Sequence, residues 1–421
     1  MDIVSASPGC RSCGEEGLLE FLSLGPMPLT DAYVPQSLVG EPEPRYPLDV
    51  AFCPRCSLVQ ILFTVSAAEI FESYSYYSSF SETLMAHSLE HVRQVIAERD
   101  LGPDSLVIEL ASNDGYLLRN FVGQGIPVLG IDPARGPADA AEAIGVPTLR
   151  EFFGPDVAAR LKAQGQVADV VIANNVLAHV PHVNSFVEGI AIILAEDGVA
   201  EIEVPYVRDL IDKLEFDTIY HEHLCYFSIT TLDTLFRRHG LSLERVQAVP
   251  IHGGSLRLTV GRHPDERTSV TAYLEQEEAD GLNRIDYYRE FAGRVAELRG
   301  GLRGKLLELR SGGSRIAAYG AAAKGTVLLN SSGIGADLID FVADKSPHKQ
   351  GKFMPGVGIP IVPPERLLQE SPEYVLLLVW NLTDEIVREQ RAYLEAGGRF
   401  IVPIPVPIEI GKEDLPSDLS G

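Results

Sequence analysis

The sequence predicts an α/β protein in which a small N-terminal metal-binding module precedes two Rossmann-like domains. Three observations support this prediction. The 421-residue length suits two or three domains better than one. Four cysteines near the N-terminus form two C-x-x-C pairs. Further along the chain, short apolar segments alternate with helical patterns in two separate stretches, as in doubly wound, mostly parallel sheets.

The two cysteine pairs indicate a zinc site. Cys10 and Cys13 form the first pair and Cys53 and Cys56 the second, with 39 residues between them. Two such knuckles can direct four thiolates to one tetrahedral Zn²⁺. A dithiol redox pair, an iron–sulfur cluster and chance are the alternatives. A closed site of four cysteines is structural, so we expect the zinc to support folding. The fifth cysteine, Cys225, is a lone thiol among aromatic residues and is expected to be a core residue.

Composition divides the chain into four segments. Residues 1–70 are loop-rich and contain many prolines, so they can bury only a small core and need the metal. Residues 71–262 form the first α/β domain, and residues 263–311 form a charged connector of two helices. Residues 312–421 form the second, smaller Rossmann-like domain.

Apolar periodicity places the elements of both α/β domains. Residues 71–100 are expected to be an aromatic-rich loop followed by a helix. The first domain is predicted to contain strands over 106–110, 128–131, 169–173, 200–204 and 256–260. One helix is predicted to begin over 115–122, and a second is predicted to end over 190–194, before a turn at 197–198. The second domain is predicted to contain strands over 316–319, 338–342, 374–379 and 400–403, with helices over 322–330 and 384–396.

Charge and hydropathy exclude several classes of partner. The net charge of −24 repels polyanions, and no Lys/Arg-rich run offsets it, so nucleic acid is not expected to bind. No apolar stretch approaches the roughly 20 residues of a membrane-spanning helix, and no signal peptide is evident. We therefore expect a cytoplasmic protein that binds no membrane.

A cofactor site is predicted where the first domain's strands end. Asp132 follows the second strand and lies 23 residues after Glu109, a spacing that suits the ribose hydroxyls of an adenosyl group. The loop after the first strand has one glycine, Gly115, and so gives little close backbone approach to a pyrophosphate. It suits the phosphate-free, positively charged S-adenosylmethionine (SAM) better than NAD, which is the alternative. The residues expected to bind the cofactor are Glu109, Ala111, Asn113, Gly115, Asp132 and Asn174.

The segment Tyr220-His221-Glu222-His223 is a dense polar cluster between apolar residues. A phenol, a carboxylate and two imidazoles can remove a proton from carbon and hold the resulting charge. Each residue alone also suits a structural role, such as a core aromatic at a strand end. On a helix His221 and His223 would point apart, so a zinc-protease site does not fit.

The whole chain resembles the SAM-dependent sugar C-methyltransferases that act on nucleotide-linked 4-keto deoxysugars, including C-3′-methyltransferases of antibiotic deoxysugar biosynthesis. The resemblance is carried, in chain order, by the paired C-x-x-C knuckles, E-L-A-S-N-D-G, A-N-N-V-L-A-H-V, Y-H-E-H, H-G-G-S-L-R and Y-G-A-A-A-K-G. It implies a class I (Rossmann-like) methyltransferase domain, SAM as cofactor, structural Zn²⁺, and a C-terminal domain that helps bind the nucleotide end of the substrate.

The resemblance also implies residue roles. The positions that match the family's active site are Tyr76, His179, Tyr220, Glu222 and His223. Tyr74 and Tyr77 are alternatives to Tyr76, which would close over the sugar. His223 is the expected base, Glu222 orients it or binds the sugar, and Tyr220 and His179 polarise the C-4 carbonyl. His221 replaces an acidic residue of some members and is the least expected to be catalytic.

In the second α/β domain, Lys324 opens a helix after Gly320 and would face the substrate's diphosphate together with Lys349. A solvated turn is the alternative for both lysines.

The expected reaction moves a methyl group from SAM to the carbon beside the sugar ketone through an enolate. C-3 is favoured over C-5 as the acceptor carbon, and dTDP is the expected nucleotide. The alternatives are an NAD-dependent dehydrogenase or epimerase of a nucleotide sugar and, against the acidity, a nucleic-acid-binding zinc module. Three domains that bury one another favour a monomer.

Overall fold

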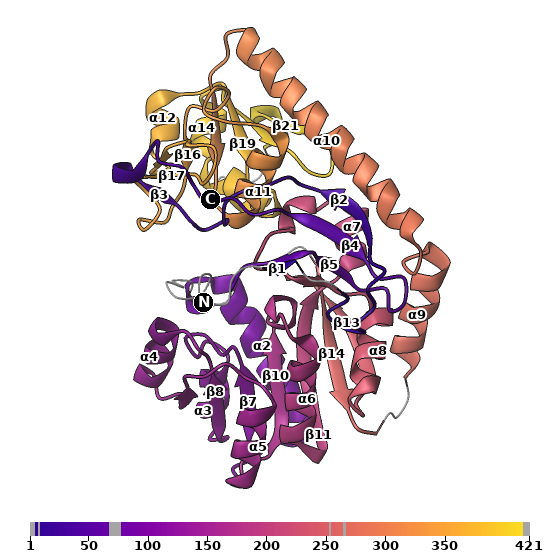
Figure 1. Cartoon of the computed structure of the whole chain (residues 1–421). Helices are drawn as coiled ribbons and strands as arrows, with labels where there is room; N and C mark the ends of the chain where they lie inside the picture. Colours follow the sequence, from indigo (N-terminus) through magenta and orange to yellow (C-terminus); the bar gives the residue numbers. More distant parts are fainter. Residues whose placement is uncertain (1–4, 7–8, 67–76, 252–253, 264–266, 416–421) are drawn as a thin grey trace. The chain divides into compact units, whose positions relative to one another are not determined.

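The computed structural model describes residues 5–6, 9–66, 77–251, 254–263 and 267–415 (Figure 1). The chain divides into two compact units, each made of three separate segments. Unit 1 comprises Met1–Leu19, Ala51–Arg208 and Leu224–Ile285, and unit 2 comprises Glu20–Val50, Asp209–His223 and Asp286–Gly421. The boundaries predicted at residues 70, 262 and 311 stay predictions.

Unit 1 contains a seven-stranded sheet of order β13-β14-β11-β10-β7-β8-β9, which confirms the predicted doubly wound α/β domain (Figure 1). Five neighbouring strands are parallel, and β14 is antiparallel to both β11 and β13. The strands are β7 (Val107–Leu110), β8 (Val128–Ile131), β9 (Thr148–Leu149), β10 (Ala168–Asn174), β11 (Leu194–Pro205), β13 (Ser242–Val249) and β14 (Ser255–Gly261). Four-residue β7 is buried throughout, which suits its three apolar residues in a parallel sheet and places the carboxyl group of Glu109 among them.

Helices cover this sheet, with α2 (Glu82–Arg99) and α3 (Leu118–Val122) contributing to the core on one face. Ser81 caps α2, because its hydroxyl accepts a hydrogen bond from the Leu84 N–H, and the helix ends at Asp100 in the left-handed region. The other helices of unit 1 are α4 (Arg135–Ala143), α5 (Pro155–Ala163), α6 (Val183–Ile193), α8 (Ile229–Arg238) and α9 (Thr268–Asp280).

Unit 2 contains a six-stranded sheet of order β18-β16-β15-β19-β20-β21, parallel except for β21, which confirms the second Rossmann-like domain. Its strands are β15 (Ile316–Tyr319), β16 (Val342–Ala343), β18 (Ile361–Val362), β19 (Tyr374–Leu377), β20 (Arg399–Val402) and β21 (Ile408–Ile410). Its helices are α10 (Ile285–Ser311), α11 (Ala323–Ser332), α12 (Arg366–Glu370), α13 (Thr383–Glu389) and α14 (Arg391–Glu395). The two helices expected within residues 263–311 are α9 and α10, and their role as a connector stays a prediction.

The N-terminal segments contribute short strands. In unit 1, β1 (Ser5–Ala6) pairs with β6 (Phe63–Thr64), and β5 (Val59–Ile61) pairs with β12 (Cys225–Tyr226). In unit 2, β3 (Val34–Pro35) pairs with β17 (Lys352–Phe353). The chain passes from one unit to the other within β2 (Leu19–Ser23), β4 (Asp49–Phe52), α7 (Val207–Asp212) and α10, and also between His223 and Leu224.

Three expectations about the elements are wrong. The turn predicted at Asp197-Gly198 lies inside β11, where the pairing moves from Ala168–Leu194 to Val170–Val199, so these residues form a bulge. The helix predicted over 384–396 is two helices, which meet at Gln390. Of the strand predicted over 338–342, only Val342 lies in the two-residue β16 (Val342–Ala343). In addition, the edge strand β13 was not predicted.

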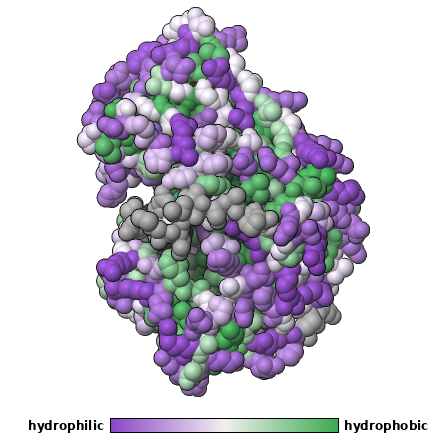
Figure 2. All heavy atoms as spheres, in the orientation of Figure 1, coloured by the Kyte–Doolittle hydropathy of each residue, from purple (hydrophilic) through white to green (hydrophobic). Residues whose placement is uncertain are grey.

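The surface in Figure 2 is covered mainly by hydrophilic residues, and hydrophobic residues form small separate patches. Among the described residues, no helix combines the length and the apolar character needed to cross a membrane.

Candidate active site and zinc centre

The polar cluster of unit 2 forms a tight turn after the 3-10 helix η4 (Phe216–Thr218). The His223 N–H donates to the Tyr220 carbonyl over 2.9 Å, which brings the two side chains together. Their ring centroids are 4.1 Å apart, and the Tyr220 hydroxyl oxygen lies 3.0 Å from His223 Nε2. The sequence cluster is therefore a tyrosine–histidine pair.

The contact of the second ring nitrogen of His223 decides which nitrogen carries the hydrogen in the neutral ring. Its Nδ1 lies 3.0 Å from the Thr218 carbonyl oxygen, which can only accept, so Nδ1 carries the hydrogen. In a neutral imidazole Nε2 is then the basic nitrogen, and it accepts the hydrogen bond of the Tyr220 hydroxyl. Thr218 thus holds the ring in the tautomer that a proton-accepting Nε2 requires.

Glu222 has a hydrogen-bond partner outside the polar cluster. Its Oε1 accepts a hydrogen bond from the Thr30 hydroxyl over 3.2 Å, and the orientation of His223 is set by Thr218. Burial, aided by the charge of Asp31, raises the pKa of Glu222 to about 7. A carboxyl group with this pKa can donate or accept a proton near neutral pH.

His221 has the burial and contacts of a structural residue. Its side chain is buried, and its Nε2 lies 3.3 Å and 3.2 Å from the carbonyl oxygens of Tyr46 and Pro47. Burial lowers the pKa of His221, which keeps the ring neutral. This geometry agrees with the expectation that His221 is the member of the cluster least suited to catalysis.

Of the other expected active-site residues, His179 lies in unit 1 at the end of η3 (Leu177–His179), after β10. Its neighbour Ala178 accepts a hydrogen bond from the Leu224 N–H over 2.8 Å. Tyr76 and its alternative Tyr74 lie outside the described residues, whereas Tyr77 is described.

The loop after β7 gathers acidic side chains at the carboxyl ends of the strands. Ala111, Asn113 and Gly115 have positive φ angles, so the chain turns sharply there. Asp132 fixes this loop, since its Oδ2 accepts from the Asn113 N–H and its Oδ1 from the Ala134 N–H, both over 2.8 Å. Glu109 lies at the end of β7 and is 1% exposed.

The residues of this loop fit a cofactor with hydroxyl donors and a positive charge. Burial, with the charges of Asp132 and Asp114, raises the pKa of Glu109 well above its usual value, and burial raises that of Asp132. Among the described residues, buried oxygens without a hydrogen-bond partner concentrate here: Glu109 Oε2, Ser112 Oγ, Asp114 Oδ1 and Asn174 Oδ1. Ribose hydroxyls and an ammonium group would supply the missing donors.

The sequence did not single out Ser78 and Ser79 of η2 (Ser78–Phe80), which contact this loop. The Ser78 N–H donates to Asn113 Oδ1 over 2.9 Å, and the Ser79 N–H donates to Asp114 Oδ2 over 3.1 Å. Backbone donors carry no sequence signal, so only the structure could find them.

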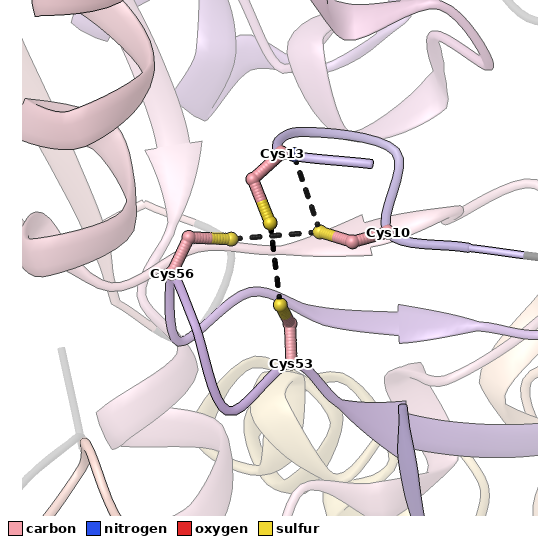
Figure 3. Close-up of side chains that lie close together, drawn as sticks. All are labelled: Cys10, Cys13, Cys53 and Cys56. Atoms are coloured by element: carbon pink, nitrogen blue, oxygen red, sulfur yellow. Dashed lines mark hydrogen bonds between the residues drawn. The ribbon is translucent and has the colours of Figure 1, made fainter. Parts of the chain in front are cut away.

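The four cysteines meet as predicted (Figure 3). Their sulfur atoms all lie within 4.8 Å of one another, and the Cys10–Cys56 and Cys13–Cys53 sulfur pairs are each 3.5 Å apart. A tetrahedral zinc with bonds of ~2.3 Å requires sulfur separations of ~3.8 Å, so the four thiols fit the metal. Cys225 is buried and is not part of the group, as expected.

Each lysine expected to bind substrate has a partner within unit 2. Lys324 Nζ lies 2.8 Å from Asn381 Oδ1 and 4.8 Å from the centre of the Trp380 ring. Lys349 Nζ donates to the Ala321 carbonyl over 2.7 Å and lies 5.1 Å from the Tyr33 ring. An ammonium group has three donors, so these contacts orient both lysines at the start of α11 and leave capacity for an anion.

Asp132 allows a test of the cofactor site. We expect Asp132→Ala to weaken SAM binding roughly 30- to 150-fold, because hydrogen bonds to a charged acceptor contribute about 2–3 kcal/mol. Isothermal titration calorimetry measures this change. Asp139→Ala on α4, whose side chain is 61% exposed, is the control and should bind SAM normally. Equal affinity of the Asp132 and Asp139 variants would remove Asp132 from the site.

The chain is similar to known proteins over nearly its whole length. Family models match residues 10–71 as a zinc binding domain, residues 82–246 as a methyltransferase domain and residues 250–405 as a C-methyltransferase C-terminal domain. The C-methyltransferase NovU of Streptomyces niveus is 36% identical over 415 residues, which cover 98% of this chain and 99% of NovU.

Solved structures resemble part of the chain. Magnesium protoporphyrin IX methyltransferase from Synechocystis PCC 6803 with bound SAM matches 47% of this chain and 89% of its own, at 16% identity and a TM-score of 0.33. The PH0226 protein from Pyrococcus horikoshii OT3 matches 47% of this chain and 99% of its own, at 14% identity and a TM-score of 0.37.

Proposed function

Because the chain belongs to the C-methyltransferase family, whose members use SAM and carry a structural zinc site, we propose that it methylates a nucleotide-linked 4-keto deoxysugar. The proposed acceptor is C-3, next to the ketone, and the proposed nucleotide is dTDP. The observation that carries the proposal is the Tyr220–His223 pair, in which Thr218 leaves the basic Nε2 of His223 directed at the phenol. Hydride transfer with NAD, the alternative considered from the sequence, receives no support from the family matches.

In the proposed mechanism, His223 Nε2 removes the C-3 proton, and the electron pair of the C–H bond moves into an enolate with its charge on the C-4 oxygen. The Tyr220 hydroxyl can rotate from Nε2 to this oxygen and donate to it, with His179 as a second donor. When bound, SAM supplies a methyl group, whose bond to sulfur breaks as its bond to C-3 forms.

Other residues bind and orient in this scheme. Glu222 would hydrogen-bond the sugar, as its Thr30 contact occupies one carboxyl oxygen. Glu109, Ala111, Asn113, Gly115, Asp132 and Asn174 would hold SAM, and Tyr76 would close over the sugar. We also propose that the enzyme is a monomer in the cytoplasm. Light scattering tests whether it is a monomer.

The test of the function is product formation. Purified enzyme with SAM and a dTDP-4-keto-deoxysugar should yield a nucleotide sugar heavier by one methyl group, and NMR of the product locates that group. A small panel that varies the nucleotide and the hydroxyl or amino group at C-3 defines the substrate. Methylation of oxygen or nitrogen instead of carbon would refute the proposed reaction.

We further propose that Lys324 and Lys349 bind the diphosphate at the N-terminus of α11, where helix N–H groups attract anions. Lys349→Gln should raise the substrate KM about tenfold and leave the Kd for SAM unchanged, as steady-state kinetics and calorimetry can measure. Lys345→Gln is the matched control, because that ammonium already pairs with Glu385 and Glu389. An unchanged KM in the Lys349 variant would favour the solvated turn instead.

A further inference from the structure

A buried charged cluster in unit 1 has no part in the proposed chemistry. It joins Glu203 of β11, Arg257 of β14 and His87 of α2. Glu203 Oε1 lies 2.8 Å from Arg257 Nε and 2.6 Å from its Nη2, and His87 Nε2 lies 2.9 Å and 3.1 Å from the two oxygens of Glu203. The side chains of Glu203 and Arg257 are 1% and 6% exposed, and that of His87 is 17% exposed.

Such burial requires a reason, because removing charged groups from water is costly unless each charge is paired. Burial alone would raise the pKa of Glu203, but the His87 hydrogen bond and the Arg257 charge lower it to about 2. Glu203 is therefore ionised, and its partners come from a neighbouring strand and from the helix that covers the sheet. The cluster fixes the position of α2 by charge and hydrogen bonding as well as by apolar contacts.

The sheet register places this cluster beside the cofactor site. Glu203 pairs with Asn174 on β10 and with Arg257 on β14, so the three residues form one row at the carboxyl end of β10. Side chains in one row of a sheet point to the same face. Asn174 is an expected cofactor residue, and its Oδ1 has no hydrogen-bond partner.

The other end of the connection is η2, which directly precedes α2. Its Ser78 and Ser79 N–H groups donate to Asn113 and Asp114 of the cofactor loop. Tyr77 reaches further, since a Cβ at Gly136 of α4 would lie 2.8 Å from the Tyr77 hydroxyl oxygen. The start of α2 therefore depends on the cofactor loop, and its second turn depends on the Glu203–Arg257 pair through His87.

We propose that Arg257 and Glu203 are positioning residues for the cofactor. Through His87 they hold α2 where Ser78 and Ser79 secure the Asn113–Asp114 turn, and so they set the affinity for SAM. This assigns a role to the arginine of the H-G-G-S-L-R motif. The inference rests on SAM as cofactor and is independent of the proposed sugar substrate.

A second ion pair provides a matched control. Arg245 of β13 binds Glu98 of α2 with Nη2 2.7 Å and Nη1 3.2 Å from its carboxylate oxygens. This pair also joins α2 to the sheet, but Glu98 lies eleven residues beyond His87, roughly 16 Å along the helix and away from η2. The side chains of Arg245 and Glu98 are 41% and 39% exposed, so this pair tests whether any ion pair between α2 and the sheet affects SAM binding.

The experiment compares Glu203→Leu/Arg257→Met, which replaces both charges by apolar groups, with Glu98→Gln/Arg245→Gln. Calorimetry gives the Kd for SAM, and hydrogen exchange reports on the Ser78 and Ser79 amides. The first variant should bind SAM at least tenfold more weakly, exchange both amides faster and show a raised KM for SAM with kcat retained at saturation. The second should match the wild type in all three.

Wild-type SAM affinity in the first variant would overturn the proposal, as would an equal loss of affinity in the second. If the apolar variant does not fold, Glu203→Gln decides, because it keeps the size of the side chain and removes only its charge. That variant should weaken SAM binding at least threefold, and an unchanged Kd would overturn the proposal.

Discussion

Replacing Cys53 with alanine is expected to remove the zinc and to lower the melting temperature by roughly 10 °C or more, equal to at least about 4 kcal/mol. The four sulfur atoms lie within 4.8 Å of one another, and three of the four cysteines are buried; among the described residues, the group contains no further cysteine, histidine or carboxylate that could replace a lost ligand. Zinc also joins two chain segments that are far apart in sequence. Elemental analysis should give one zinc per wild-type chain and none in the variant.

Cys225→Ala is the control for this prediction. Cys225 is equally buried and is also a free thiol, but it lies outside the group of four. Its replacement removes a small apolar side chain and should leave the zinc content at one per chain, with a much smaller fall in melting temperature. Loss of zinc from both variants would show that the metal content reports on general unfolding instead of on ligation.

Replacing His223 with asparagine is expected to lower the rate of methyl transfer by a factor of 10² to 10⁴, the range that a positioned base contributes. Asparagine has a similar polar side chain but cannot take a proton near neutral pH. Incubation of the keto-sugar with enzyme in heavy water isolates the first step, because a base that removes the C-3 proton also catalyses its exchange for deuterium. The variant should lose this exchange together with methyl transfer.

His221→Asn is the matched control, two residues away. His221 lies buried against the carbonyl groups of Tyr46 and Pro47, so its loss should lower the melting temperature while kcat stays within about threefold of wild type. Normal deuterium exchange by the His223 variant would assign the base to another residue. Strong loss of exchange in the His221 variant alone would reverse the roles of the two histidines.

Much of the fold was predictable because apolar periodicity is local. β8 and β15 were predicted to the residue, since each is a short apolar run bounded by turn residues. Asp197-Gly198 misled the prediction because a bulge inside a strand has the same composition as a turn. The break at Gln390 also escaped prediction, because neither glycine nor proline marks it.

The candidate site was predictable in its reactive side chains but not in their partners. Tyr220 and His223 are three residues apart in the sequence, so a single turn of the chain suffices to pair them. Thr218 acts through its backbone carbonyl and Thr30 comes from a segment almost 200 residues away, so neither contact has a sequence signal. The cysteine pairs were predictable because their spacing reflects the geometry of the metal.

The alternation of the chain between its two units determines when each can form during synthesis. Unit 2 needs residues 20–50, which leave the ribosome early, and also Asp286–Gly421, and 235 residues separate these segments. At about 5–20 residues per second, the early segment waits on the order of ten to fifty seconds for its partners. Residues 209–223, which carry Tyr220 and His223, wait for the same C-terminal segment. Unit 1 can be complete once residue 285 has emerged, so unit 2, which carries the proposed catalytic base, is the later of the two units to be completed.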